Sequence, residues 1–401
     1  MESIAVLSPR VTRILGQNPG PFTLQGTNTY LVAPQASSSS SNAILPTILV
    51  DTGDGEEAYI PLLERTLRGA GLSAASSKDG HIPAGRRYIT EIALSHRHHD
   101  HVDGLPSVLA LLSRLRSDSE FSSTPLPLPR LHKKPDAKHD PDLVEVLRGL
   151  PADSFEPYRT EPNSEPSPLW PLKHDDVLST HREGSSLQVT ERANLRVVES
   201  PGHTADHLCF LLQEERTLFT ADHVLGQGTT VFEDLTAYID SLTRCSALLQ
   251  QTGPSVFHSD VENRLYPGHG PVVERGRFIL KQYADHRRER EKQILELLET
   301  PSPTRSHSAD GSPEWSLQEI VSELYAGFPE NVLQAATRGI FLHVHRLATN
   351  DWPKSVGRVK CLRYPEYAQA ILGNPPRVPE NWEEWGQVGS SRWSLIKRAA
   401  F

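Results

Sequence analysis

Apolar and polar residues in the first part of the chain follow two spacings, one typical of strands and one of helices. Strand-like runs bounded by glycine, aspartate or serine lie at 26–32, 47–53 and 89–95. A helical spacing of apolar residues, at Ile60, Leu63 and Leu67, separates the second run from the third. Another extends from Leu105 to Leu115. The pattern therefore predicts buried strands with helices packed against them.

The stretch 117–176 has neither spacing. It is rich in proline, serine and charge, and only 143–150 has a helical pattern. We expect a surface insertion here and two shorter ones, near 34–46 and 73–87, where serine and glycine accumulate. Isolated histidines in polar loops are solvated far more often than they bind metal. We therefore assign no role to His132, His139, His174 and His181.

Strand-like runs return after this stretch, and most of them end at a residue that can bind metal. They lie at 195–199, 208–212, 218–220 and 265–267. Three of these runs, like the run 89–95, are followed by a turn that contains a histidine or an aspartate. These turn residues are His96, His203, Asp222 and His269. Such convergence from distant positions is what a metal site at the edge of a sheet requires.

The sequence around His96 is the strongest single motif. It reads SHRHHDH and places His96, His98, Asp100 and His101 in the spacing HxHxDH. Imidazole and carboxylate are ligands that Zn²⁺ takes, and residues two apart on a turning loop can reach one ion while others face a second. With 18 histidines in 401 residues, about one such chain in five hundred would contain the pattern by accident. We interpret it as one half of a two-metal site.

The chain after residue 276 has the pattern of long helices. Apolar stripes lie within 276–298 and 330–347, and a segment rich in serine and proline lies between them. The last part contains four of the six tryptophans but no ligand spacing, so its role is not readable. We predict a catalytic domain over 1–276, a helical domain over 277–350 and a tail over 351–401.

Composition narrows the class of protein. Of the 401 residues, 37% are apolar, and a net charge of -9 gives no general attraction to nucleic acid or to anionic membranes. No run reaches the eighteen or so apolar residues of a membrane-spanning helix, and the amino terminus resembles neither a signal nor a transit peptide. We expect a cytoplasmic protein. Three cysteines, Cys209, Cys245 and Cys361, lack CxxC spacing and indicate no disulfide framework or cysteine zinc site.

Six segments together resemble one protein family. They are GTNTYLV (26–32), LVDTG (49–53), SHRHHDH (95–101), SPGHT (200–204), TADHVLGQGTTVFEDL (220–235) and YPGHG (266–270). The set is similar to the metallo-β-lactamase superfamily and, within it, to the lactamase-beta-2-like proteins. The resemblance extends over residues 9–350, with interruptions at the insertions.

This resemblance implies an α/β fold, an αββα sandwich with two zinc ions at one edge and a helical, winged-helix-like C-terminal appendage. The ligands that it implies are His96, His98 and His203 for the first zinc, Asp100, His101 and His269 for the second, and Asp222 for both. Asp51 would orient a ligand imidazole by a hydrogen bond. His99 is out of register and is expected to bind no metal. Asp103 stands where the family often has glycine, so its carboxylate would either narrow the substrate range or cap the helix that follows, and we favour the cap.

The implied activity is hydrolysis by a metal-bound hydroxide, with Asp100 as a catalytic residue. Fungal relatives of this subfamily resemble thioesterases that release a polyketide from an acyl carrier protein, whereas animal relatives resemble single-strand endoribonucleases. The acidic balance and the lack of a base-stacking motif favour the thioester, since proteins that follow a nucleic-acid backbone usually have a basic groove. A non-catalytic scaffold is disfavoured because every expected ligand is present.

The expected partner is therefore an acyl substrate, either small or attached to a carrier protein. RNA is the alternative, and no membrane partner is expected. A homodimer stays open, because nothing in the sequence decides the oligomeric state.

Overall fold

The computed structural model describes residues 1–35, 44–69, 85–121, 124–182, 191–251, 263–349, 358–363, 378–379 and 382–396. The chain divides into two compact units. The first consists of Met1–Thr230 and Ser241–Leu280, and the second of Val231–Asp240 and Lys281–Phe401. The predicted insertions near 34–46 and 73–87 lie mostly outside the described residues.

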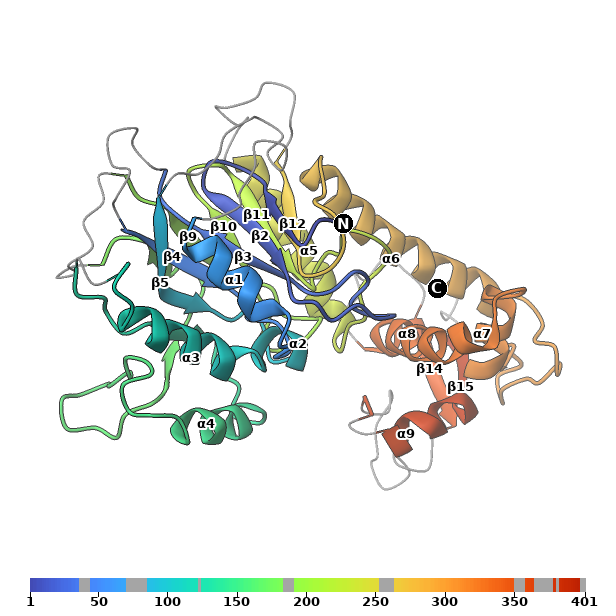
Figure 1. Ribbon diagram of the computed structural model, residues 1–401. Coiled ribbons are helices and arrows are strands. Elements are labelled where there is room, and N and C mark those ends of the chain that lie inside the picture. The colour runs from blue at the N-terminus through green and yellow to red at the C-terminus, as the bar shows by residue number, and fades with distance from the viewer. Residues whose placement is uncertain are drawn as a thin grey trace. The chain divides into compact units, whose positions relative to one another are not determined.

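A seven-stranded sheet forms one half of the first unit, in the order β1-β2-β3-β4-β5-β6-β7. Figure 1 labels the strands β2 to β5 of this sheet. Its strands are β1 (Ile4–Val6), β2 (Val11–Leu15), β3 (Asn28–Val32), β4 (Ile44–Val50), β5 (Arg86–Ala93), β6 (Arg130–Lys133) and β7 (Leu169–Pro171). The first four pair antiparallel, whereas β4 to β7 are parallel. Helices α1 (Tyr59–Leu67) and α3 (Leu105–Arg116) provide the crossovers that parallel strands need.

A five-stranded sheet forms the other half of this unit, in the order β12-β11-β10-β9-β8. Its strands are β8 (Val177–Ser179), β9 (Asn194–Glu199), β10 (Leu208–Leu212), β11 (Thr217–Ala221) and β12 (Leu265–Pro267). Strands β8 to β11 pair antiparallel, and β12 lies parallel to β11. Helix α5 (Leu235–Gln251) lies in the crossover between the last two strands.

The two sheets pack face to face. Tyr30 and Ile48 of the first sheet share a core with Phe210 and Phe219 of the second. Helices α1 and α3 cover the other face of the first sheet through a second core. On the second sheet, Cys209 contacts Cys245 of α5, and all three cysteines are buried free thiols. The layers form the predicted αββα sandwich, which is confirmed.

The stretch 117–176, expected to cover the surface, contributes two strands to the first sheet. Strands β6 and β7 lie in it, together with α4 (Asp140–Arg148). His132 of β6 is only 7% exposed, and its Nε2 lies 2.6 Å from the carboxylate of Glu91. The expectation that this histidine is solvated is therefore wrong. Strands of three or four residues are too short for a periodic pattern to reveal them.

The second unit combines helices with a small antiparallel sheet of order β13-β15-β14. Its elements are most of α6 (Gly276–Leu298), then β13 (Trp315–Ser316), α7 (Leu317–Leu324), α8 (Glu330–Ala348), β14 (Arg358–Arg363), α9 (Trp382–Gln387), η3 (Val388–Ser390) and β15 (Arg392–Ile396). Glu291 of α6, fully buried, binds Arg346 of α8 at 2.6 Å. No helix in the described part of the chain is both long and apolar enough to cross a membrane.

Candidate metal centre

Strand ends from both sheets converge at one edge of the first unit. The residues that follow β5, β9, β11 and β12 there are His96, His203, Asp222 and His269. Strands β9, β11 and β12 run in the same direction, so their carboxyl ends share this edge. The short helix α2 (His99–Val102) begins directly behind His98 and carries Asp100 and His101.

The first cluster consists of His96, His98, His203 and Asp222. The Nε2 atoms of His96 and His203 both lie 3.0 Å from Nδ1 of His98. Oδ2 of Asp222 lies 3.7 Å from Nε2 of His203. A neutral imidazole has only one N–H group, so three converging ring nitrogens cannot all be satisfied by one another.

The second cluster consists of Asp100, His101 and His269. The Nε2 atoms of both histidines lie 3.3 Å from Oδ2 of Asp100. Oδ1 of Asp222 lies 3.5 Å from Nε2 of His101 and 3.3 Å from Nε2 of His269. Asp222 therefore turns one oxygen toward each cluster.

The residues of both clusters fit a divalent metal. With metal–nitrogen bonds of about 2.0–2.1 Å, neighbouring tetrahedral ligand atoms lie about 3.3 Å apart. The distances above range from 3.0 to 3.7 Å. Nε2 of His101 and Oδ1 of Asp222 are buried and make no hydrogen bond within the described residues. Such orphaned buried atoms are rare in proteins, and a cation between them would satisfy both.

The charges of the two clusters differ. Burial and the neighbouring imidazoles lower the pKa of His98 to about 3 and hold the pKa of His96 well below its usual value. These imidazoles are therefore neutral and can act as ligands. Burial also disfavours charge on His269, but the carboxylates of Asp222 and Asp100 outweigh it and raise the pKa of His269 to about 9. The second cluster thus favours a positive charge, as a cation site should.

Asp51 is hydrogen-bonded to one histidine of each cluster, directly or through Ser95, on the side of the ring that faces away from the converging ligand atoms. It follows β4 with a φ of 58°, a backbone conformation uncommon outside glycine, and is 2% exposed. Its Oδ2 accepts hydrogen bonds from Nδ1 of His101 at 2.7 Å and from Oγ of Ser95 at 2.8 Å. Since that hydroxyl donates to Asp51, its oxygen accepts from Nδ1 of His96, 2.9 Å away. One carboxylate therefore orients a ligand of each cluster, more than the single imidazole expected from the sequence.

Two threonines that received no role from the sequence contact cluster residues. Oγ1 of Thr27 donates to Oδ2 of Asp100 at 2.8 Å, and Oγ1 of Thr230 lies 3.2 Å from Nδ1 of His203. Both threonines belong to the segments that resemble the family, GTNTYLV and TADHVLGQGTTVFEDL. Membership in those segments was the only signal for them, because a threonine has no ligand-like spacing.

Gly268 leaves room for the two clusters. A Cβ atom at this position would lie 2.3 Å from Oδ1 of Asp222 and 3.0 Å from the ring of His101. Any other residue would therefore displace a side chain of the site. The glycine of the YPGHG segment is required by this close approach.

His99 and Asp103 lie outside both clusters within the described chain. The side chain of His99 is 91% exposed, and its Nδ1 lies 3.0 Å from Oδ2 of Asp103. Gly104 is the N-cap residue of α3, which has no side-chain cap. The expectation that Asp103 caps this helix is therefore wrong, and the nearby imidazole binds its carboxylate instead.

Comparison with known proteins agrees with this geometry. No family model matches the sequence. The chain is 31% identical over 348 residues to a beta-lactamase-like protein 2 homolog of Caenorhabditis elegans, covering 86% of this chain and 87% of the relative. It is 28% identical to an atrochrysone carboxyl ACP thioesterase of Aspergillus fumigatus, covering 83% and 78%.

Among solved structures, a beta-lactamase domain protein from Burkholderia ambifaria superposes with a TM-score of 0.55 at 16% identity, covering 98% of this chain and 93% of that one. At this identity the match supports the fold alone, whereas the curated relatives extend over most of both chains. The αββα sandwich, the two ligand clusters and the curated relatives all indicate the same family. The chain belongs to the metallo-β-lactamase superfamily and, within it, to the group that contains the beta-lactamase-like protein 2 homologs.

Proposed function

We propose that this protein is a zinc-dependent hydrolase that binds two Zn²⁺ ions and releases an acyl or polyketide chain from an acyl carrier protein by cleaving its thioester. The observation that carries the proposal is the pair of clusters joined by Asp222, each with the donor set of a zinc site. The choice of thioester is supported by the Aspergillus relative, whose name states that activity.

The residues assigned to the metals are those of the two clusters. His96, His98 and His203 would hold the first ion, Asp100, His101 and His269 the second, and Asp222 both. Zinc bound there would polarise the substrate carbonyl and make water a nucleophile at neutral pH.

The exposure and contacts of Asp100 support the catalytic role proposed for it. Its side chain is 22% exposed, compared with 12% for Asp222 and 2% for Asp51, so it faces the open side of the site. Its Oδ2 is held by Thr27 and faces the imidazoles of the second cluster. Within the described residues Oδ1 has no hydrogen-bond partner, so it would accept a hydrogen bond from the attacking water and turn a lone pair of that water toward the substrate.

Parallel assays of the full chain, loaded with zinc, test the proposal. One uses an acyl carrier protein charged with an acyl chain through its thioester, with release of the acid followed by mass spectrometry. The other uses a short fluorescent single-stranded RNA, the substrate of the alternative reading. We expect release of the acid and no cleavage of RNA.

Two variants serve as controls for these assays. His98→Ala should abolish the activity, because it removes a ligand of the first cluster. His99→Ala should retain it, because this neighbouring imidazole is exposed and outside both clusters. RNA cleavage without thioester hydrolysis would contradict the proposal and favour a nuclease.

A further inference from the structure

Asp206 is a buried carboxylate outside the two clusters, and its side chain contacts three residues, two of which belong to other segments of the chain. It lies in the loop between β9 and β10, and its side chain is fully buried. Its Oδ2 accepts a hydrogen bond from Nζ of Lys133 at 2.7 Å, and its Oδ1 accepts one from Oγ1 of Thr204 at 2.7 Å. Nη1 of Arg97 lies 3.6 Å from Oδ1. A buried charge is tolerated only with such partners, so their positions are tightly coupled.

Two of these partners adjoin residues of the first cluster. Thr204 directly follows His203, and Arg97 lies between His96 and His98. Asp206 therefore joins the loop that presents His203 to the loop that presents the other two histidines. These loops follow strands of different sheets, β9 and β5, so the contact also joins the two halves of the sandwich at its metal-binding edge.

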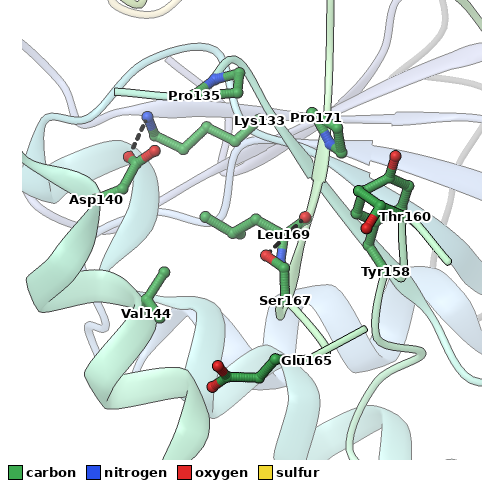
Figure 2. Close-up of a pocket in the computed structure, with 10 residues that line it drawn as sticks. All are labelled: Lys133, Pro135, Asp140, Val144, Tyr158, Thr160, Glu165, Ser167, Leu169 and Pro171. Atoms are coloured by element: carbon green, nitrogen blue, oxygen red, sulfur yellow. Dashed lines mark hydrogen bonds and ion pairs between the residues drawn. The ribbon is translucent and has the colours of Figure 1, made fainter. Parts of the chain in front are cut away.

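The third partner, Lys133, is anchored at the end of β6. It is 1% exposed, and its ammonium lies 2.6 Å from Oδ1 of Asp140 in α4 and donates to the carbonyl of Lys134 at 3.1 Å. Lys133 also borders a cavity of about 240 Å³, and Figure 2 shows the ammonium turned toward Asp140 there. Charged side chains of alternating sign therefore form a continuous series of ion pairs between the first cluster and this cavity. In that direction they are Arg97, Asp206, Lys133 and Asp140.

We propose that Asp206 is a positioning residue of the metal centre, which holds the His203 loop against the loop of His96 and His98 so that the first cluster is formed before a metal binds. Ligands already in place bind more tightly, because less chain has to be ordered on binding. Lys133 contributes by fixing the orientation of this carboxylate. Within the described residues, no hydrogen bond or ion pair joins Asp206 to Asp100, His101 or His269.

Metal titration of the full chain tests this inference without a substrate, so the result does not depend on which bond the enzyme cleaves. Asp206→Asn keeps the size of the side chain but removes its charge and one acceptor oxygen. Zinc affinity is measured against a competing chelator, and the visible spectrum of bound Co²⁺ reports the ligand geometry. We expect affinity at the first cluster to fall about tenfold or more, the scale for losing a group that orients metal ligands, with little change at the second. Lys133→Met should give a smaller loss in the same direction.

Glu91→Gln is the matched control. Glu91 lies in β5, next to the strand that carries Lys133, is 4% exposed and forms a comparable buried pair with His132 at 2.6 Å. This variant should lower the melting temperature of the metal-free protein without changing zinc affinity. If Asp206→Asn does not fold, Thr204→Val removes one donor while keeping every charge, and it should weaken the first cluster alone.

Two results would overturn the inference. One is wild-type zinc affinity at both clusters in folded Asp206→Asn or Thr204→Val protein. The other is an equal loss of zinc affinity at both clusters in Asp206→Asn, together with a similar loss in Glu91→Gln when the two variants have lost the same thermal stability. Either would show that Asp206 stabilises the fold without positioning the ligands.

Discussion

Replacing Asp51 with asparagine should weaken metal binding at both clusters, because this carboxylate sets the protonation of one ligand imidazole in each. In the wild-type protein every proton of the network points toward Asp51. His101 donates to it from Nδ1, and His96 donates to Ser95, whose hydroxyl donates to the same oxygen. When a metal is bound, both histidines therefore present an unprotonated Nε2 to it, with the remaining ring proton on Nδ1.

An amide reverses these hydrogen bonds. The backbone N–H of Ser95 donates to Oδ1 of Asp51 at 2.7 Å, so the oxygen of the amide would take that position and its NH₂ group the other. The NH₂ group then donates to Nδ1 of His101 and to Oγ of Ser95. Ser95 in turn donates to Nδ1 of His96. Each imidazole would be left with its proton on Nε2, where it blocks a metal.

The size of the effect follows from the number of ligands affected. Losing one partner that orients a metal ligand lowers metal affinity about 10- to 100-fold, or about 1.4–2.8 kcal/mol. Since Asp51 serves one ligand in each cluster, Asp51→Asn should lose this amount at both clusters. Ser95→Ala removes only the hydrogen bond to His96, so it should lower metal affinity by this amount at the first cluster alone.

Chelator-competition titrations with Zn²⁺ on the metal-free wild type and the two variants measure these losses, and circular dichroism checks that each variant is folded. The comparison separates tautomer control from general damage, because only the former predicts that the serine variant affects one cluster and the asparagine variant two. Folded Asp51→Asn protein that binds metal with wild-type affinity at either cluster would refute the reasoning.

Four other changes have distinct expected outcomes. Asp100→Asn should retain metal at the first cluster and lower kcat by about a hundredfold or more, the effect of removing one well-placed group; full recovery of single-turnover rate at saturating zinc would show that this residue is only a ligand. His269→Ala should lower the bound metal by about one ion per chain in elemental analysis; unchanged metal content would place the second ion elsewhere. Phe22 is 81% exposed, and the loop that carries it ends at Thr27, which donates a hydrogen bond to Asp100. Phe22→Ala should therefore raise KM for an acyl substrate without changing metal content. An unchanged KM would show that this ring does not contact the substrate. Ser316→Ala removes the capping box of α7 and should lower the free energy of unfolding of the second unit by about 1 kcal/mol in urea; an unchanged unfolding midpoint would show that the cap does not stabilise this unit.

The periodic pattern of the sequence predicted buried strands with helices packed against them and candidate ligands at strand ends, because strands and amphipathic helices have their own periods and metal ligands occur in short motifs. The resemblance to the metallo-β-lactamase superfamily then implied the αββα order of the layers and the division of the ligands between two metals. The spacing from His96 to His101 lies within one loop and one turn of helix, so it needs no knowledge of the rest of the chain.

Only the tertiary structure decided which other residues serve the site. Thr27 reaches Asp100 across 73 positions, and Asp206 reaches Lys133 across the same distance in sequence. No local pattern encodes a contact between segments so far apart, because the pairing depends on how the two sheets pack. The same holds for His132, which lies in a polar stretch of the sequence and becomes buried because its short strand lies between β5 and β7, where its ring reaches Glu91.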